Sequence, residues 1–218
     1  NRYKFLRWWE LIKMNSNYSE TNAPFKTSPL DSKQITTRGP VNADITLKEE
    51  KELGKLILRG SLNDKKFITP IKKYLSEQFP APPNVFFDDA KVRVVWLGPD
   101  EWLLLTNWDE IDTLTADLTK VLSKTYFALV DVTDNSTIIE LKGRQSLEIL
   151  MKGCSLDLHP KVFQPGCSVQ TDLGLANIIL LKIAEGPVFQ IVVRASFANY
   201  LWDWLLDAAD EFKLRIET

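Results

Sequence analysis

The stretch WLGPDEWLLL, Trp96–Leu105, has the pattern of two strands joined by a tight turn. Pro99 has the φ angle that the second position of a β-turn requires, and Asp100 is a common turn residue. The segment KVRVVWLG (91–98) before the turn alternates apolar and polar residues, and EWLLLTN (101–107) after it is apolar and rich in leucine. The sequence therefore predicts an antiparallel hairpin here.

Asp100 and Glu101 offer a different interpretation of the same stretch, as a pair of catalytic acids. Adjacent residues in an extended chain point to opposite faces, so these two carboxylates are poorly placed to act on one substrate. Catalytic carboxylates also need a cleft that shifts their pKa values. We therefore interpret the stretch as a structural hairpin on which Trp96 and Trp102 pack.

Working outward from the hairpin, strand and helix patterns alternate along the chain. Short strands joined by turns and flanked by amphipathic helices are typical of an α+β fold, in which antiparallel sheets are covered by helices on one face. Residues Asn63 or Asp64 and Ser196 are candidate helix caps. The predicted strands are 55–62, 91–98, 101–107, 127–134, 136–143, 167–172, 176–186, 188–194 and 213–217, and the predicted helices are 63–79, 108–124, 144–153 and 197–212.

These patterns predict one domain over residues 41–218, built from two packed βαβ-type units, 55–140 and 141–218. A short Asp-Asn turn is expected to join the strands 127–134 and 136–143.

Residues 1–40 differ from the rest and predict an extended or flexible N-terminal arm. The first 13 residues are basic and aromatic, and the following stretch is rich in Ser, Thr, Asn and Pro without helical or strand periodicity. Met14 is a candidate initiator. Phe25 and Leu30 are candidate anchors through which the arm becomes ordered on a partner. The composition alone equally allows a flexible terminus without such a role.

The bulk composition argues against several classes of protein. The chain has 218 residues, a hydrophobic content of 44% and a net charge of −2, so it lacks the basic excess typical of nucleic-acid binding. No apolar run approaches the roughly 20 residues that span a bilayer, and the first residues do not read as a signal peptide. We expect a cytoplasmic protein without nucleic-acid or membrane partners.

Metal binding is also poorly matched by the residues available. Cys154, Cys167 and His159 are the chain's only cysteines and histidine, and they show none of the closely spaced ligand pairs of structural zinc sites. We expect two free thiols, largely buried, since a disulfide is unfavourable in a reducing compartment.

The last predicted helix is apolar on more than one side. Phe197, Leu201, Trp204, Leu205, Ala208 and Phe212 fall on one arc, which is enough to dock the helix on a sheet. Trp202, Leu206 and Ala209 form a second apolar strip, which we expect on the solvent side as a partner interface. The alternative is a helix buried on two sides by its own domain.

Several motifs resemble those of the gamma subunit family of heterotetrameric sarcosine oxidase and, more remotely, the folate-binding region of aminomethyltransferases such as the glycine-cleavage T-protein. WLGPDEWLLL (96–105) is similar to a family motif, and SPL (28–30) and LRG (58–60) match its early landmarks. The long stretch from Val130 to Leu173 is similar to the family's central signature. The segment SFANYLWDWLLDAA (196–209) resembles its closing helix, which aminomethyltransferases share.

This resemblance implies a fold like the folate-binding domain of aminomethyltransferase and a non-catalytic role. The complex demethylates sarcosine oxidatively to glycine and passes the one-carbon unit to tetrahydrofolate. FAD, FMN, NAD and folate are then expected on the larger of its alpha, beta and delta subunits, and this chain is expected to bind none of them alone. The chain agrees in having no GxGxxG loop after a strand.

A free-standing folate-binding protein of the aminomethyltransferase class is the alternative function. It predicts a central pocket with a pterin ring between aromatic side chains, and a carboxylate that bonds the ring. Asp131 and Asp134 are the candidates for that carboxylate, although both equally suit a turn.

KGC (152–154) resembles a motif in another folate-binding relative, involved in maintaining iron–sulfur enzymes. Here Ser155, Leu156 and Asp157 follow the cysteine instead of that relative's aromatic residue and Gly-Gln-Glu. A reactive thiol would also need a lowered pKa and solvent access, so a redox or catalytic Cys154 is the less favoured interpretation.

Overall fold

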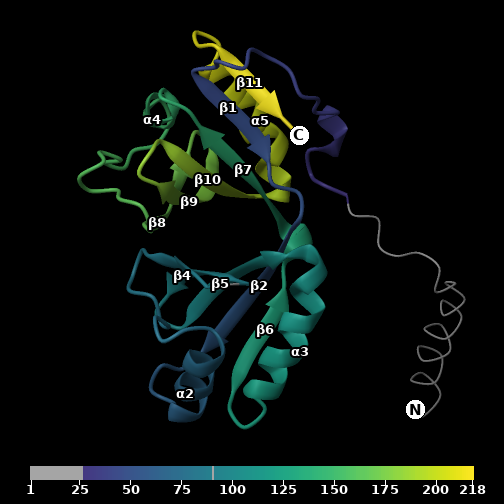
Figure 1. Ribbon diagram of the computed structural model, residues 1–218, viewed down its shortest axis with the longest axis vertical. Helices are drawn as coiled ribbons and strands as arrows, with labels where there is room; N and C mark the ends of the chain where they lie inside the picture. The colour runs from purple at the N-terminus through teal and green to yellow at the C-terminus, as the bar shows by residue number, and fades with distance from the viewer. Residues whose placement is uncertain (1–26, 90) are drawn as a thin grey trace, which may run out of the picture.

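The computed structural model describes residues 27–89 and 91–218, and it contains two β-sheets, one above the other in Figure 1. Phe25 and Met14 lie outside the described residues. The upper sheet has the strand order β11-β1-β7-β10-β9-β8 and the lower has the order β3-β4-β5-β2-β6. The upper strands are β1 (Ile45–Glu49), β7 (Ser136–Lys142), β8 (Ser168–Leu173), β9 (Ala176–Ala184), β10 (Val188–Arg194) and β11 (Leu214–Glu217). The lower strands are β2 (Leu53–Gly60), β3 (Phe86–Asp88), β4 (Arg93–Gly98), β5 (Glu101–Asn107) and β6 (Phe127–Asp131).

The predicted hairpin is confirmed, and it forms the centre of the lower sheet. Strands β4 and β5 pair antiparallel, with Gly98 opposite Glu101 and Trp96 opposite Trp102. Trp102 is fully buried, and its ring lies 4.7 Å from the ring of Phe79, centroid to centroid. Phe67 stacks on the same tryptophan at 6.1 Å. The hairpin therefore anchors an aromatic core, as its two tryptophans suggested.

The expected hairpin between the strands 127–134 and 136–143 is wrong. Strand β6 pairs with β2, whereas β7 pairs with β1 and β10 in the other sheet. The short 3₁₀ turn η3 (Thr133–Asn135) carries the chain from one sheet to the other. Residues 136–140 therefore lie in the upper sheet, and so does the early strand β1, whose β character the sequence did not reveal. Periodicity identifies a strand but not its partner, and this is the reason for the error.

In the described part of the chain, four α-helices cover the outer faces of the sheets: α2 (Lys65–Tyr74), α3 (Ile111–Val121), α4 (Ser146–Met151) and α5 (Ala195–Ala208). Asp64 caps α2, because its Oδ1 accepts a hydrogen bond from the Lys66 N–H at 2.8 Å. The expected Ser196 cap is wrong, since α5 follows β10 directly and Arg194 occupies the cap position without a side-chain bond. The 3₁₀ turns η1 (Asp31–Lys33) and η2 (Trp108–Glu110) complete the elements.

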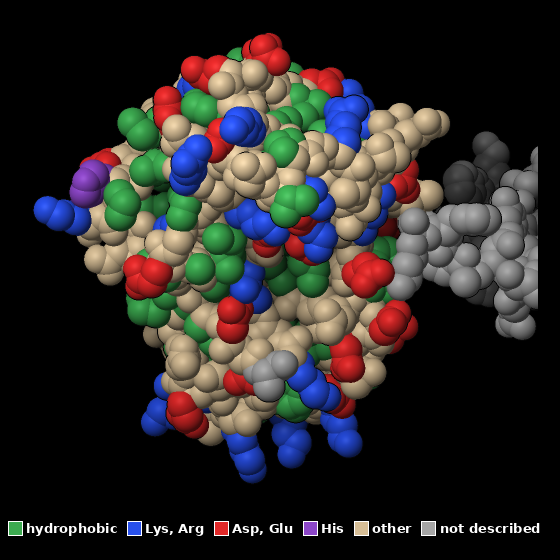
Figure 2. Space-filling view, turned by 45° about the horizontal axis from the view of Figure 1, so that its top comes forward, with side chains coloured by type: hydrophobic (Ala, Val, Ile, Leu, Met, Phe, Trp, Pro, Cys, Tyr) green, Lys and Arg blue, Asp and Glu red, His purple; other side chains and the backbone are tan. Residues whose placement is uncertain are grey.

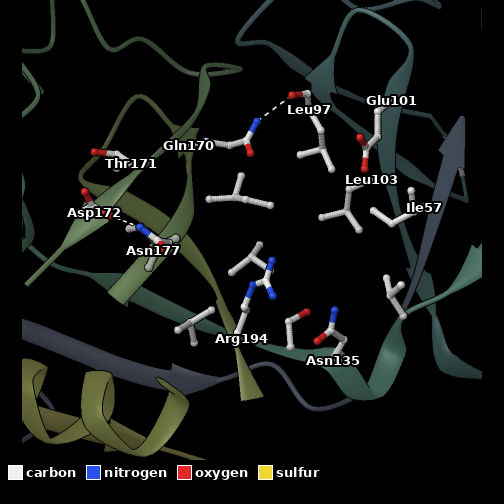
Figure 3. Close-up of a pocket in the computed structure, with 16 residues that line it drawn as sticks. Ile57, Leu97, Glu101, Leu103, Asn135, Gln170, Thr171, Asp172, Asn177 and Arg194 are labelled. Atoms are coloured by element: carbon white, nitrogen blue, oxygen red, sulfur yellow. Dashed lines mark hydrogen bonds between the residues drawn. The ribbon is translucent and has the colours of Figure 1, made fainter. Parts of the chain in front are cut away.

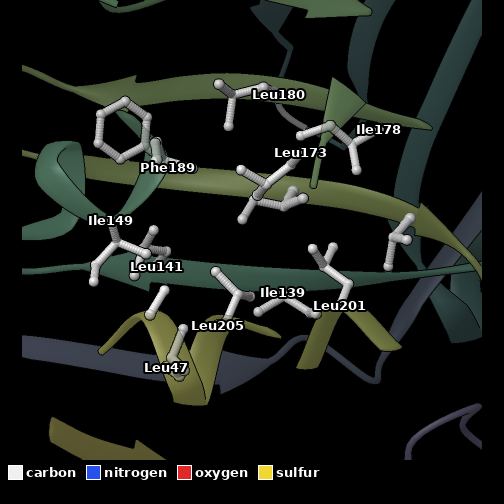
Figure 4. Packing of buried hydrophobic residues seen from close by; sticks show 14 of the residues in the cluster. Leu47, Ile139, Leu141, Ile149, Leu173, Ile178, Leu180, Phe189, Leu201 and Leu205 are labelled. Carbon is white, nitrogen blue, oxygen red and sulfur yellow. The ribbon is translucent and has the colours of Figure 1, made fainter. Parts of the chain in front are cut away.

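Three apolar clusters hold these layers together. The first lies between the upper sheet and α5, where Leu201 and Leu205 face Ile139 and Leu141 (Figure 4). The second joins the lower sheet to α2 and α3. The third lies between the sheets and is the one that positions the site described below; its buried members are Phe86, Val95, Leu103, Leu105, Ile138, Leu181 and Val192.

The sheets are also joined by hydrogen bonds near the start of β3. The Phe86 N–H donates to Gly166 O at 2.8 Å, and the Ser168 N–H donates to Asn84 O at 2.9 Å. Arg93 of β4 donates to the Gln190 side chain of β10 at 2.6 Å. These bonds tie the two sheets together across their facing surfaces.

The solvent-facing strip expected on α5 is wrong for Trp202 and Ala209, which are 2% and 1% exposed. Leu206 is partly buried against the same cluster, and Leu30, the expected partner anchor, is fully buried. The segment before β1 covers this side of the helix. Two polar contacts hold it there, since Lys33 pairs with Asp203 at 2.6 Å and Asn199 donates to Pro29 O at 3.3 Å. The chain thus buries its own second strip, which was the alternative left open.

Candidate functional site

A cavity of about 650 Å³ lies between the two sheets, next to the inter-sheet cluster (Figure 3). Its size falls within the range of small-molecule sites in proteins, roughly 300–1,000 Å³. The lower sheet contributes Ile57, Leu97, Glu101 and Leu103, and the crossover between the sheets contributes Val132, Asn135 and Ser136. The upper sheet contributes Gln170, Thr171, Asp172, Asn177, Ile178, Ile179, Val192, Val193 and Arg194.

One polar row runs across four strands of the upper sheet at the wall of this cavity. Ser136 of β7 pairs with Arg194 of β10, and Asp172 of β8 pairs with Asn177 of β9. Because Val193 pairs with Ile178 in antiparallel strands, Arg194 lies opposite Asn177 at the next position of the ladder. Side chains at paired positions lie on the same face of a sheet, so the register alone brings these four together.

Most of the polar groups around the cavity already have partners. Asn177 donates to Asp172, and the Gln170 side chain donates to Leu97 O at 2.7 Å, both drawn in Figure 3. Glu101 forms an ion pair with Arg59, with Nε 3.8 Å from Oε2. Figure 3 shows the Arg194 side chain reaching into the centre of the cavity. Among the residues that the structure describes, Arg194 has no hydrogen bond or ion pair through its side chain.

The candidate folate carboxylates, Asp131 and Asp134, do not line this cavity. Asp131 is exposed, and its Oδ1 accepts a hydrogen bond from the Thr133 N–H at 2.9 Å, as a turn residue does. Asp134 is exposed at a separate, smaller pocket of about 230 Å³. The carboxylates that do line the cavity are Asp172 and Glu101. Strand alternation is the signal that could have located Glu101 here, because it shares a face with Leu103.

The lining does not match the pterin pocket that the folate alternative predicts. None of the sixteen described residues around the cavity is aromatic, so no pair of rings is available to hold a pterin between them. The residues present therefore do not fit folate in the expected manner.

The smaller pocket contains a buried lysine beside the crossover. Lys55 is 4% exposed, and its Nζ donates to Leu53 O and Thr133 O, both at 3.1 Å. Burial lowers the pKa of Lys55, opposed by the charges of Asp134, Asp131 and Glu49. Both acceptors are backbone carbonyls of the segments around the crossover, which favours a structural role for this lysine.

The thiols are free, as predicted, although only Cys154 is buried and Cys167 is half-buried. The Lys152 ammonium is directed to α5 and its C-terminal end, where it donates to Ala208 O at 2.6 Å and to the Glu211 carboxylate. Over residues 27–89 and 91–218, no group of three or more His, Cys, Asp or Glu side chains is placed to hold a metal ion. Within the same residues, no helix combines the length and apolar character needed to cross a bilayer.

A second feature of interest is an apolar surface beside α5, formed by Met151, Leu175 and Phe197 with the half-buried Tyr200 and Trp204. The first three are 66%, 77% and 40% exposed. The Phe197 and Tyr200 rings meet edge to face at 6.5 Å. Trp204 lies against the backbone of Gly153, two residues after Met151, and Gly153 in turn bonds to Gly174 beside Leu175. We call these five residues the α5 patch.

The rest of the surface shows a mixed pattern of charge. On the face seen in Figure 2, Lys, Arg, Asp and Glu side chains intersperse with hydrophobic ones and surround a hollow between the two halves of the molecule. This face shows no broad region of a single charge, which agrees with the nearly neutral net charge.

Comparison with known proteins places these features in a family context. Residues 59–211 match the model of the sarcosine oxidase, gamma subunit family. The chain is 34% identical over 119 residues to the sarcosine oxidase subunit gamma of Corynebacterium sp. (strain P-1), which covers 55% of this chain and 57% of that protein. It is 33% identical over 125 residues to the same subunit of Corynebacterium sp. (strain U-96), covering 57% and 60%. The chain thus spans about three fifths of the length of these relatives.

Two solved structures share the fold. A chain of the heterotetrameric sarcosine oxidase from Corynebacterium sp. U-96, solved with pyrrole 2-carboxylate, matches with a TM-score of 0.74 and 26% identity, over 85% of this chain and 95% of that chain. The glycine cleavage system aminomethyltransferase T from Bartonella henselae matches with a TM-score of 0.62 and 12% identity, over 80% of this chain and 48% of that one. The second likeness confirms the predicted aminomethyltransferase-like fold.

Proposed function

The chain belongs to the sarcosine oxidase, gamma subunit family, and from this membership we propose that it is the gamma subunit of a heterotetrameric sarcosine oxidase. The observation that carries the proposal is the likeness to a chain of such an enzyme over 95% of that chain's length. Its partners in this proposal are the alpha, beta and delta subunits. The complex would oxidise sarcosine to glycine and transfer the one-carbon unit to tetrahydrofolate.

The chain's own part in this complex is structural. FAD, FMN and NAD belong to the other subunits in this proposal, because the sequence lacks the Gly-rich fingerprint of a dinucleotide site. The paired-acid interpretation of the hairpin is also unsupported, because both carboxylates form ion pairs with Arg59. Asp100 Oδ2 lies 3.2 Å from Arg59 Nη2, and Glu101 Oε2 lies 3.8 Å from Arg59 Nε. The cytoplasmic location expected from the sequence stays a prediction.

The α5 patch is the surface that we assign to contact with the other subunits. Exposed apolar side chains that cluster around aromatic residues are typical of protein interfaces, and Trp and Tyr are enriched among interface hot spots. This patch replaces the strip of Trp202, Leu206 and Ala209. Its Phe197, Tyr200 and Trp204 lie on the same helix, but on a side that the segment 29–33 leaves open.

Co-expression of all four subunits tests the proposed function. The purified chain alone is expected to show no flavin absorbance and no oxidation of sarcosine. With its partners it is expected to co-purify as a flavin-containing enzyme. Sarcosine oxidation by the chain alone would contradict the proposal.

A free-standing folate-binding protein is the second candidate, and the cavity between the sheets is the observation in its favour. The lack of aromatic lining and the positions of Asp131 and Asp134 weaken it. Calorimetric titration with tetrahydrofolate discriminates the two functions. Binding heat at micromolar folate would favour this candidate, and no heat at high micromolar folate would count against it.

A further inference from the structure

We propose that the cavity between the sheets binds an organic carboxylate, with the acid group held by Arg194 and an aliphatic body lying against the inter-sheet cluster. This inference goes beyond the proposed structural role, because a bracing subunit needs no ligand of its own. It rests on three observations: the position of the Arg194 guanidinium, the bonds that the neighbouring carboxylates already make, and the apolar side chains that line the opposite part of the cavity.

Arg194 is held in place by the fold. It ends β10 opposite Ser136, and α5 begins at the next residue, so its backbone belongs to two regular elements. The guanidinium extends into the cavity, as Figure 3 shows. It forms neither a hydrogen bond nor an ion pair with any residue in the described part of the chain. A guanidinium presents two parallel N–H groups that match the two oxygens of a carboxylate.

The two carboxylates that line the cavity, Asp172 and Glu101, have other partners. Asp172 accepts from Asn177, and Glu101 lies 3.8 Å from Arg59. Neither carboxylate therefore pairs with Arg194, and the guanidinium is left available for an external anion. The Asn135 side chain lies beside Arg194 in Figure 3, where its amide can donate to a bound acid.

The opposite part of the cavity is apolar and built from both sheets. Ile57 and Leu103 are paired neighbours in the lower sheet, and Ile179 and Val192 are paired neighbours in the upper sheet. All four belong to the cluster between the sheets. A small inorganic anion would leave this wall without a contact, whereas an aliphatic chain would bury it. The combination therefore favours an organic acid.

Ligand-observed NMR on the purified full-length chain tests this site, with hexanoate as the probe and hexanamide as its uncharged match. We expect hexanoate to bind and hexanamide to bind roughly tenfold more weakly, since the amide cannot form a charge-assisted bond with the guanidinium. Arg194→Gln is expected to weaken hexanoate binding by about the same factor and to leave hexanamide unchanged. Arg194→Lys, which keeps the charge but loses the paired donors, is expected to fall between.

Arg38→Gln is the matched control. Arg38 is also an exposed arginine without a side-chain hydrogen bond in the described residues, but it lies at another pocket, beside Trp202 and Ile216. Its variant is expected to bind hexanoate like the parent chain. Circular dichroism and thermal unfolding of each variant verify that the fold is retained.

Three results would overturn the proposal. Equal binding of hexanoate and hexanamide would show that the acid group is not recognised, and unchanged binding by Arg194→Gln would place the acid elsewhere. Failure of hexanoate to bind, together with impaired assembly of Arg194→Gln with the other subunits, would assign Arg194 to an acidic side chain of a partner instead. Each result leaves the proposed gamma-subunit function standing, so the two proposals fail separately.

Discussion

The hydroxyl of Tyr200 on α5 accepts a hydrogen bond from the backbone N–H of Leu175, at 3.1 Å. This bond fixes the turn between β8 and β9 against the helix. It thereby holds Leu175, which is 77% exposed, in a defined position beside Phe197 and Tyr200. The α5 patch is thus a preformed surface, because the β8–β9 turn and α5 are tied together before any partner binds.

Loss of apolar character in the α5 patch should disrupt assembly without unfolding the chain. In the double variant Leu175→Asp, Phe197→Asp both changes are at exposed positions, so we expect the unfolding temperature to stay close to that of the parent chain. Burying the introduced charges at an interface is costly, and we expect co-purification with the other subunits to fall at least about tenfold. Size-exclusion chromatography of the co-expressed subunits measures this.

Tyr126→Asp is the control for that experiment. Tyr126 is 98% exposed and lies between α3 and β6, outside the α5 patch. The control variant is expected to assemble normally. Equal loss of assembly in both variants, or no loss in the double variant, would contradict the assignment of the α5 patch as the subunit interface.

Trp202→Ala should destabilise the isolated chain. Trp202 is 2% exposed and packs in the cluster beneath α5, so its removal is expected to cost about 3–5 kcal/mol in free energy of unfolding. Urea denaturation monitored by circular dichroism gives this value. A loss below about 1 kcal/mol would mean that Trp202 is solvent-exposed, since surface substitutions have effects of that size or smaller.

Gly60→Ala should also destabilise the chain, for a different reason. A Cβ at this position would lie 2.2 Å from the Phe67 ring, which itself stacks on Trp102. We expect the strain to lower the free energy of unfolding by about 1–3 kcal/mol. Gly186→Ala is the matched control, because a Cβ there meets no atom within 4 Å. Equal stability of the two variants would contradict the packing described here.

The Asp64 cap should make stability depend on pH in the acid range. The hydrogen bond from Thr125, followed by that from the Lys66 N–H, lowers the pKa of Asp64 below its ordinary value of 3.8. A carboxylate with a lowered pKa in the folded state stabilises the protein above 3.8, and that contribution disappears as the pH falls through the lowered pKa. Asp64→Ala is therefore expected to unfold at lower urea than the parent at pH 7, with a smaller difference near pH 3. A difference that does not depend on pH would argue against the ionised cap.

Local sequence patterns predicted most elements of the fold, but not the strands β1 and β3. Pro99 and Asp100 supply turn chemistry within four residues, so the hairpin could be identified without any knowledge of the rest of the chain. The helix cap could be narrowed to Asn63 or Asp64 for the same reason, and the structure shows that it is Asp64. The partner of β6 could not be predicted in this way, because the pairing with Leu56 and Leu58 depends on residues some 70 positions away.

The site was less accessible to prediction because it depends on strand register. Asp172, Asn177, Arg194 and Ser136 share one row only after β7, β8, β9 and β10 have paired. Trp202 was misplaced for a related reason, since the segment that covers it precedes it by some 170 residues. The helix periodicity showed two apolar strips but could not show which of them the chain itself covers.

Native mass spectrometry of the co-expressed subunits tests the central claim most directly. The account predicts that a tagged form of this chain is recovered in a single complex with one copy each of the alpha, beta and delta subunits, and that the Leu175→Asp, Phe197→Asp double variant is recovered alone. Recovery of the parent chain by itself, beside an active complex of the other three subunits, would contradict it.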